Sequence, residues 1–127
     1  MAGSISNFPL GIVGYNRTII EGTFFPNGSS AVANTSNKGK GWTVARTSQG
    51  LFTITLVDKP VAQIDFAIAT LQLASAAATL VQIGVVSPTA GTIQIRNIDT
   101  SAGVQDIAAN ANNAISFMII VRSGAEL

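Results

Sequence analysis

Few side chains in this sequence could take part in chemistry. It has neither cysteine nor histidine, which excludes thiol nucleophiles and disulfides and also removes the commonest general base and metal ligand. A serine or threonine nucleophile would need a lysine or a carboxylate as its base. None of Lys38, Lys40 and Lys59 lies in a recognisable catalytic motif. We therefore expect a protein that is not an enzyme and has no cofactor.

Carboxylates can work in pairs, as in glycosidases, or bind calcium. Most of those in this chain fall at expected strand ends and in loops, where solvated or turn-capping roles are typical. Asp99 and Asp106 share one loop, but their spacing does not match an EF-hand. We expect neither a catalytic pair nor a metal site among the six carboxylates Glu21, Asp58, Asp65, Asp99, Asp106 and Glu126.

Two short features resemble fragments of binding motifs. The run Gly39-Lys40-Gly41 lacks the earlier glycine and the following Ser or Thr of a phosphate-binding loop, and it precedes an expected strand instead of a helix. We interpret it as a turn. Trp42 is the only tryptophan and could stack on a sugar or a base, but a tryptophan that opens a strand packs more often at the rim of the core.

The charge balance narrows the possible partners. The chain carries 7 basic and 6 acidic residues, with a net charge of +1, which is too little basic excess for a surface that follows nucleic-acid phosphates. Only 10% of the residues are charged, against about 25% in an average domain. Glu and Lys, which usually cover exposed helix faces, are scarce, whereas Ile, Val and Thr suit strands. The composition predicts an all-β protein.

Runs with β-branched residues and period-2 alternation follow one another along the chain. The clearest pair is a hairpin in which Ser48-Gln49-Gly50 joins two such runs, and the second run alternates Phe52, Ile54 and Leu56 with threonines. About eight strands at this spacing predict a single antiparallel β-sandwich or jelly roll over residues 19–127. Seven of them can be delimited in the sequence, namely residues 19–25, 42–47, 51–57, 63–73, 79–86, 91–98 and 114–122.

Two segments leave alternatives open. Residues 66–86 carry no formal charge and are long enough to span a bilayer, but Gln72, Gln82 and a central run of small residues favour two strands joined by a turn. We expect no membrane partner. In residues 99–113, Val104, Ile107 and Ala108 have helical spacing, so this loop is expected either to be irregular or to contain a short helix.

Residues 1–18 have glycines, a proline and scattered apolar side chains without a clean period. We interpret them as an N-terminal arm that gains order on docking. The alternative is a first strand paired at the edge of the domain itself. The arm residues expected to make contact are Ile5, Phe8, Leu10, Ile12 and Val13.

The last expected strand is apolar on both faces. One face has Ile115, Phe117, Ile119 and Val121, and the other has Ala114, Ser116, Met118 and Ile120. One face of an antiparallel sandwich normally meets water. We therefore predict that Ala114, Ser116, Met118 and Ile120 form a contact between subunits, with a thick two-sided core in one chain as the alternative. Residues 63–73 show a weaker version of this pattern, with Ile64, Phe66 and Ile68 expected on one face.

Two stretches carry a resemblance to a known class of proteins. Residues 39–56 (GKGWTVARTSQGLFTITL) and 113–122 (NAISFMIIVR) resemble strands of small jelly-roll virion proteins of tailed bacteriophages. The second stretch is also similar to the final strand of trimeric jelly rolls of the tumour necrosis factor type. The resemblance covers residues 20 to 123 and rests on loose β-sandwich patterns.

This resemblance implies a capsid decoration (cement) protein. Such a protein would form a homotrimer on the outer surface of the phage head, and its N-terminal arm would bind the major capsid protein. The family has no catalytic residues to carry over. The alternatives are a head or tail fibre tip domain that binds a receptor and a small carbohydrate-binding module, although 1 Trp and 1 Tyr supply few aromatic platforms for a sugar.

Overall fold

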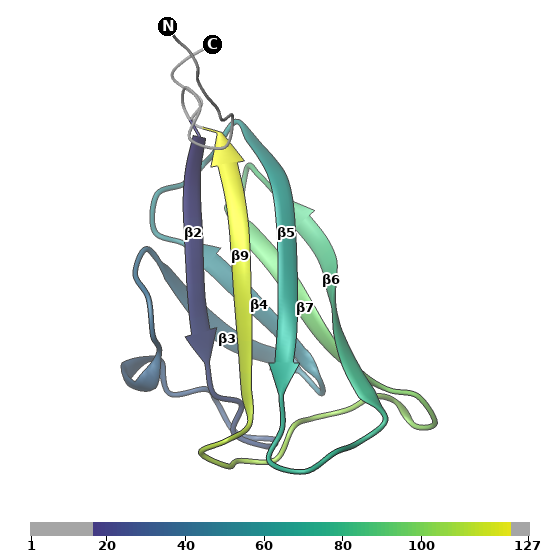
Figure 1. Cartoon of the computed structure of the whole chain (residues 1–127). Coiled ribbons are helices and arrows are strands. Elements are labelled where there is room, and N and C mark those ends of the chain that lie inside the picture. Colours follow the sequence, from purple (N-terminus) through teal and green to yellow (C-terminus); the bar gives the residue numbers. More distant parts are fainter. Residues whose placement is uncertain (1–16, 123–127) are drawn as a thin grey trace, which may run out of the picture.

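The computed structural model describes residues 17–122, which form two antiparallel sheets packed face to face (Figure 1). One sheet has three strands in the order β2-β9-β5. The other has five strands in the order β3-β4-β7-β6, with the short β8 paired to β7. The predicted sandwich of about eight strands is confirmed. The strands are β2 (Arg17–Phe24), β3 (Trp42–Ser48), β4 (Leu51–Leu56), β5 (Gln63–Gln72), β6 (Thr79–Ser87), β7 (Thr92–Asp99), β8 (Gly103–Val104) and β9 (Ala114–Arg122).

The bounds of each expected strand differ by at most two residues from those of an observed strand. The agreement arises because period-2 alternation places one face of each run in the core. β2 pairs with β9 from Arg17 onward, so it includes the last two residues of the predicted arm. The rest of that arm lies outside the described residues. Residues 99–113 contain β8 and turns, without a helix, whereas the loop after β2 contains a 3-10 turn at Asn34–Ser36.

The uncharged segment 66–86 is the end of β5, a connection and most of β6, as expected for two strands joined by a turn. Within residues 17–122, no helix is long and apolar enough to cross a membrane.

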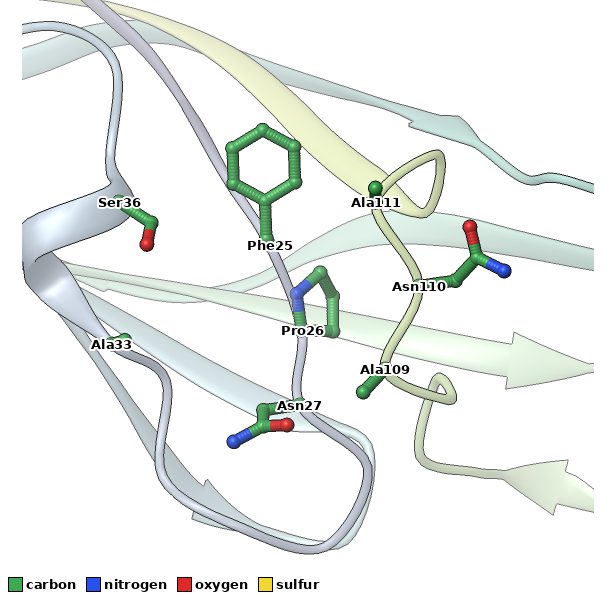
Figure 2. A pocket seen from close by; sticks show the side chains of 8 residues that line it. All are labelled: Phe25, Pro26, Asn27, Ala33, Ser36, Ala109, Asn110 and Ala111. Carbon is green, nitrogen blue, oxygen red and sulfur yellow. The ribbon is translucent and has the colours of Figure 1, made fainter.

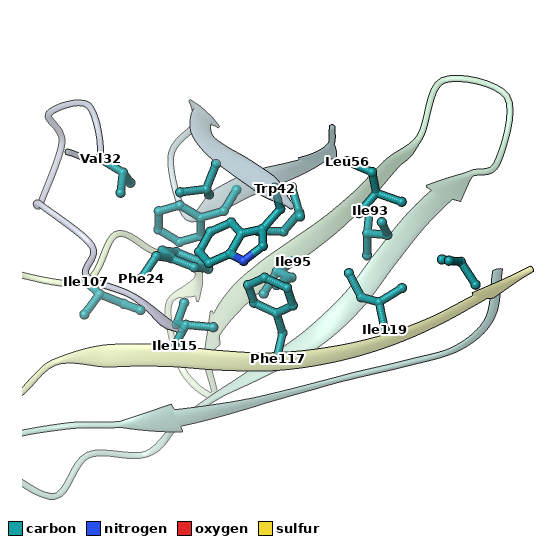
Figure 3. Close-up of a cluster of buried hydrophobic side chains, with 14 residues drawn as sticks. Phe24, Val32, Trp42, Leu56, Ile93, Ile95, Ile107, Ile115, Phe117 and Ile119 are labelled. Carbon is teal, nitrogen blue, oxygen red and sulfur yellow. The ribbon is translucent and has the colours of Figure 1, made fainter. Parts of the chain in front are cut away.

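The core lies between the sheets (Figure 3) and is built by alternate residues of the central strands. β9 contributes Ile115, Phe117, Ile119 and Val121, all at most 5% exposed. Trp42 is 6% exposed, and its ring centroid lies 4.7 Å from that of Phe117 in an edge-to-face arrangement. The prediction that Trp42 packs in the core is confirmed, and its ring is not available as a platform for a ligand.

Gly22 allows this aromatic cluster to form. A Cβ atom at this position would lie 2.2 Å from Cζ2 of Trp42, which is far inside van der Waals contact. A glycine in a strand often marks such a close approach. The indole of Trp42 therefore packs directly on the backbone of β2.

The two ends of the sandwich differ. Arg17 and Arg122 are partners in the β2–β9 ladder, so both termini of the described chain lie at one end (Figure 1). The connections that follow β2 and precede β9 lie at the opposite end.

Candidate functional site

The site follows from the register of the three-stranded sheet. Since side chains alternate along each strand, the residues of β9 that do not face the core point away from the sandwich, with their partners in β2 and β5 beside them. We call this surface the outer face. Its three rows are Ile19, Ile120 and Phe66; Glu21, Met118 and Ile68; and Thr23, Ser116 and Thr70.

Apart from Glu21 on β2, which is exposed, the first two rows form an exposed apolar surface. Ile19 is 39% exposed, Phe66 46% and Ile68 45%, while Met118 and Ile120 between them are half-buried. Contiguous apolar exposure of this kind marks interaction sites more often than isolated apolar residues do.

Three of the four residues predicted to form the subunit contact lie on the outer face, namely Ser116, Met118 and Ile120. Ala114 lies at the start of β9 and is only 5% exposed, so its own chain already covers it. The sequence did not single out Ile19 as a neighbour of Ile120. Period-2 alternation does place Ile19, Glu21 and Thr23 on one face of a strand. Their partners in β9, however, lie roughly 100 residues later in the sequence, so the alternation does not show which residues they meet.

β5 corrects one expectation about this face. The pairing of β5 with β9 shifts between Ile64 and Phe66, as it does where one extra residue forms a β-bulge. Ile64 therefore packs against the core together with Ala67, whereas Phe66 and Ile68 point outward. The expectation that Ile64 shares their face was wrong, because a bulge reverses the alternation of the strand.

Polar groups lie at both ends of the outer face. At the end near the chain termini, Asp65 Oδ2 accepts from Arg122 Nε at 2.9 Å and lies 3.2 Å from Arg17 Nε. At the other end, the hydroxyls of Thr23 and Ser116 are 2.9 Å apart. A patch that is mainly apolar in the centre, with Glu21 at its β2 edge and polar groups at both ends, has the general composition of a protein contact surface.

The outer surface of the five-stranded sheet is different. One row joins the hydroxyl side chains of Thr43, Thr55 and Thr92 across three strands, and the next row joins Ala45, Thr53 and Gln94, so small and polar side chains occupy the middle of this face. Exposed Leu80, Val85 and Val86 belong to β6 at its edge. The contrast indicates that the middle of the five-stranded sheet meets water, whereas the outer face is suited to being covered.

A pocket of about 450 Å³ lies at the end of the sandwich away from the termini (Figure 2). Its walls come from the segment after β2 and the segment before β9. The eight lining residues include no acid and no base, so the pocket offers no general acid, general base or charged ligand group. They are Phe25, Pro26, Asn27, Ala33, Ser36, Ala109, Asn110 and Ala111.

The two acidic residues of the 99–113 loop have local structural contacts. Asp106 accepts from Arg46 Nε at 2.9 Å and Nη2 at 2.8 Å, and from the Gly50 backbone N–H at 2.8 Å. Asp99 accepts from the backbone N–H groups of Ser101 and Ala102. The hydrogen bond from Arg46 lowers the pKa of Asp106 below its ordinary value.

Replacing Asp106 with asparagine is expected to lower the melting temperature by a few degrees at neutral pH. A carboxyl with a lowered folded-state pKa stabilises the protein above its unfolded-state pKa, and this stability is lost as the pH falls through the folded-state value. The difference in melting temperature between wild type and Asp106→Asn should therefore shrink below about pH 4. Thermal unfolding from pH 7 to pH 2.5 measures this, and a constant difference over the range would contradict the explanation.

The outer face is thus the strongest candidate for a functional site. Within residues 17–122, no three His, Cys, Asp or Glu side chains gather where they could hold a metal ion. Comparison of the chain with protein-family models, curated proteins and solved structures finds no match.

Proposed function

We propose that the protein is a structural virion protein that decorates and stabilises a bacteriophage capsid as a homotrimer on its outer surface. The observation that carries the proposal is the exposed apolar outer face, with Ser116, Met118 and Ile120 at its centre and Ile19 and Phe66 beside them. Covering such a face in an assembly removes apolar area from water, at about 25 cal/mol per Å². The resemblance of residues 39–56 and 113–122 to phage virion proteins is the reason for proposing a phage capsid as the partner.

The outer face alone offers roughly half of the area that a standard interface buries on each partner. Three strands spaced about 4.8 Å apart, each with eight residues that rise about 3.3 Å per residue, give a sheet area of roughly 400 Å². A standard interface buries about 800 Å² on each partner. In a cyclic trimer each subunit meets its neighbours through two different surfaces. The outer face would be one of these two surfaces, and it would contact the other surface on the neighbouring copy of the chain.

The predicted arm supplies the contact with the shell in this proposal. Its residues Ile5, Phe8, Leu10, Ile12 and Val13 lie outside the described residues, and β2 follows the arm directly at Arg17. β2 is an edge strand of the sheet that carries the outer face. The partner in this proposal is the major capsid protein, without nucleic acid or membrane.

Deleting residues 1–16 is expected to leave a folded oligomer that no longer binds capsids. The deletion ends before Arg17, so it keeps the whole β2–β9 ladder. Co-sedimentation of the truncated protein with capsids that lack it measures binding, and circular dichroism checks the fold. Unchanged capsid binding would refute the role of the arm. Loss of the fold would show that residues 1–16 form part of the sandwich.

Two measurements test the function as a whole. Sedimentation velocity should give a trimer at micromolar concentration, and electron microscopy of the virion with a labelled chain should place the protein in regular positions on the outside of the capsid. A monomer in solution, or label confined to a tail or fibre, would overturn the proposal.

A further inference from the structure

The loops around the pocket at the end of the sandwich away from the termini are held by asparagine side chains. Asn34 accepts from the Val44 N–H at 2.9 Å and donates to the Val44 carbonyl at 3.0 Å. Asn113, only 8% exposed, accepts from the Ala74 N–H at 2.8 Å and donates to the Ala108 carbonyl at 3.0 Å. Each amide thus ties one wall segment to its neighbours through both a donor and an acceptor. The pocket is therefore formed in the chain itself, as most small-molecule sites are.

The middle of the pocket is apolar. Phe25 and Pro26 lie between a wall from residues 33–36 and a wall from residues 109–111 (Figure 2). Phe25 is half-buried, so part of its ring is accessible. Lys38 Nζ lies over the ring, 5.9 Å from its centroid, but Lys38 does not line the pocket. The part of the ring that borders the pocket is therefore available to a ligand.

Hydrogen-bonding groups without a protein partner surround this apolar middle. Among the described residues, none bonds to Ser36 Oγ, and Asn27 donates to the Ala31 carbonyl at 3.2 Å but leaves its Oδ1 unused. In the facing wall, the backbone N–H and carbonyl groups of Ala109 and Ala111 also pair with no other part of the described chain. The pocket therefore offers both donors and acceptors, but no charge.

We propose that this pocket binds one unit of an uncharged sugar. A sugar ring presents an apolar face of C–H groups, which can pack on the aromatic ring of Phe25. Its hydroxyl groups both donate and accept, so they match Ser36 Oγ, Asn27 Oδ1 and the backbone groups of residues 109–111. The pocket volume of about 450 Å³ lies within the range of about 300 to 1,000 Å³ that is usual for small-molecule sites.

Other classes of ligand fit these walls less well. A charged ligand would find no side chain of opposite charge in the lining, and burying an unpaired charge is costly. A wholly apolar ligand would remove water from Ser36, Asn27 and the backbone of residues 109–111 without replacing its hydrogen bonds. An extended peptide typically adds to the edge of a strand, and neither wall is a strand.

This site goes beyond the proposed function and does not rest on it. The pocket shares no residue with the outer face, so failure to form a trimer or to bind capsids would leave the inference untouched. Its aromatic group is a phenylalanine, which the sequence-based count of Trp and Tyr as sugar platforms does not include.

A chemical-shift titration of the nitrogen-15-labelled full chain tests the site. The probes are glucose, galactose and N-acetylglucosamine, each added to about 50 mM. At least one of them should shift the amide signals of residues 25–36 and 109–111, with a Kd on the order of millimolar, because a single sugar unit has few atoms to contact. No shift with any of the three sugars, or shifts confined to other residues, would overturn the inference.

Three variants test whether the sugar binds at this pocket. Phe25→Leu keeps an apolar side chain but removes the aromatic face, and should raise the Kd roughly fivefold. Ala111→Leu, at an exposed position, should fill part of the pocket and also weaken binding. The matched control is Ala90→Leu, an exposed alanine in the turn between β6 and β7 at the other end of the sandwich, which should bind like the wild type.

Circular dichroism checks that each of these variants keeps its β spectrum. Wild-type affinity in both Phe25→Leu and Ala111→Leu would overturn the inference, as would equal weakening by Ala90→Leu.

Discussion

Replacing Phe117 with alanine is expected to lower the free energy of unfolding by about 3 to 5 kcal/mol. Phe117 is 5% exposed, and its ring contacts Trp42 edge to face, with a second aromatic neighbour in Phe24 at a centroid distance of 6.4 Å. Truncation would remove these contacts and leave a cavity between the sheets, because the rigid strands on both sides can only partly close it.

The matched control is Met118→Ala, one residue along the same strand. Met118 is half-buried on the outer face, so in the isolated chain its truncation should cost about 1 kcal/mol. Urea unfolding of both variants, followed by the fluorescence of the single tryptophan, measures the difference. To separate folding from assembly, the measurement is repeated over protein concentration. Equal losses for the two variants at low concentration would contradict the assignment of Phe117 to the core.

Much of the fold could be predicted because its strands obey simple alternation. In β4, Phe52, Ile54 and Leu56 are buried, while the threonines between them are half-exposed, as a period of two requires. For β5, the bounds could be predicted but the face on which each side chain lies could not. Its extra residue, Asp65, is a polar residue between two apolar ones, as an unbroken alternation would also have, so the face of Ile64 could not be read from the sequence.

The candidate site could be predicted only along its central strand. The two apolar faces of β9 are visible in the sequence, since Met118 and Ile120 alternate with Phe117 and Ile119. The neighbours of Met118 and Ile120 depend on pairing with strands about 50 and 100 residues away, which local patterns do not specify. Ala114 was predicted from its position in the alternation alone, but it is only 5% exposed in its own chain.

Replacing Ile120 with aspartate is expected to convert the oligomer into monomers that keep their β spectrum. Ile120 is half-buried at the centre of the outer face, between Ile19 and Phe66. In the isolated chain an aspartate here can reach water, so the fold should survive. In the assembly it would become an unpaired buried charge, whose desolvation costs far more than a single apolar contact contributes. Sedimentation velocity at micromolar concentration measures the result.

A charge on the opposite surface is the matched control for this experiment. Thr55→Asp lies in the hydroxyl row of the five-stranded sheet, which meets water in the proposed assembly, so this variant should sediment like the wild type. If both variants dissociated, general electrostatic repulsion would explain the loss. If Ile120→Asp stayed oligomeric, the outer face would not be the subunit contact. Dissociation of Ile120→Asp alone would assign the surface of β2, β9 and β5 to the contact between subunits, because only there would the introduced carboxylate, placed between Ile19 and Phe66, lose its water on assembly.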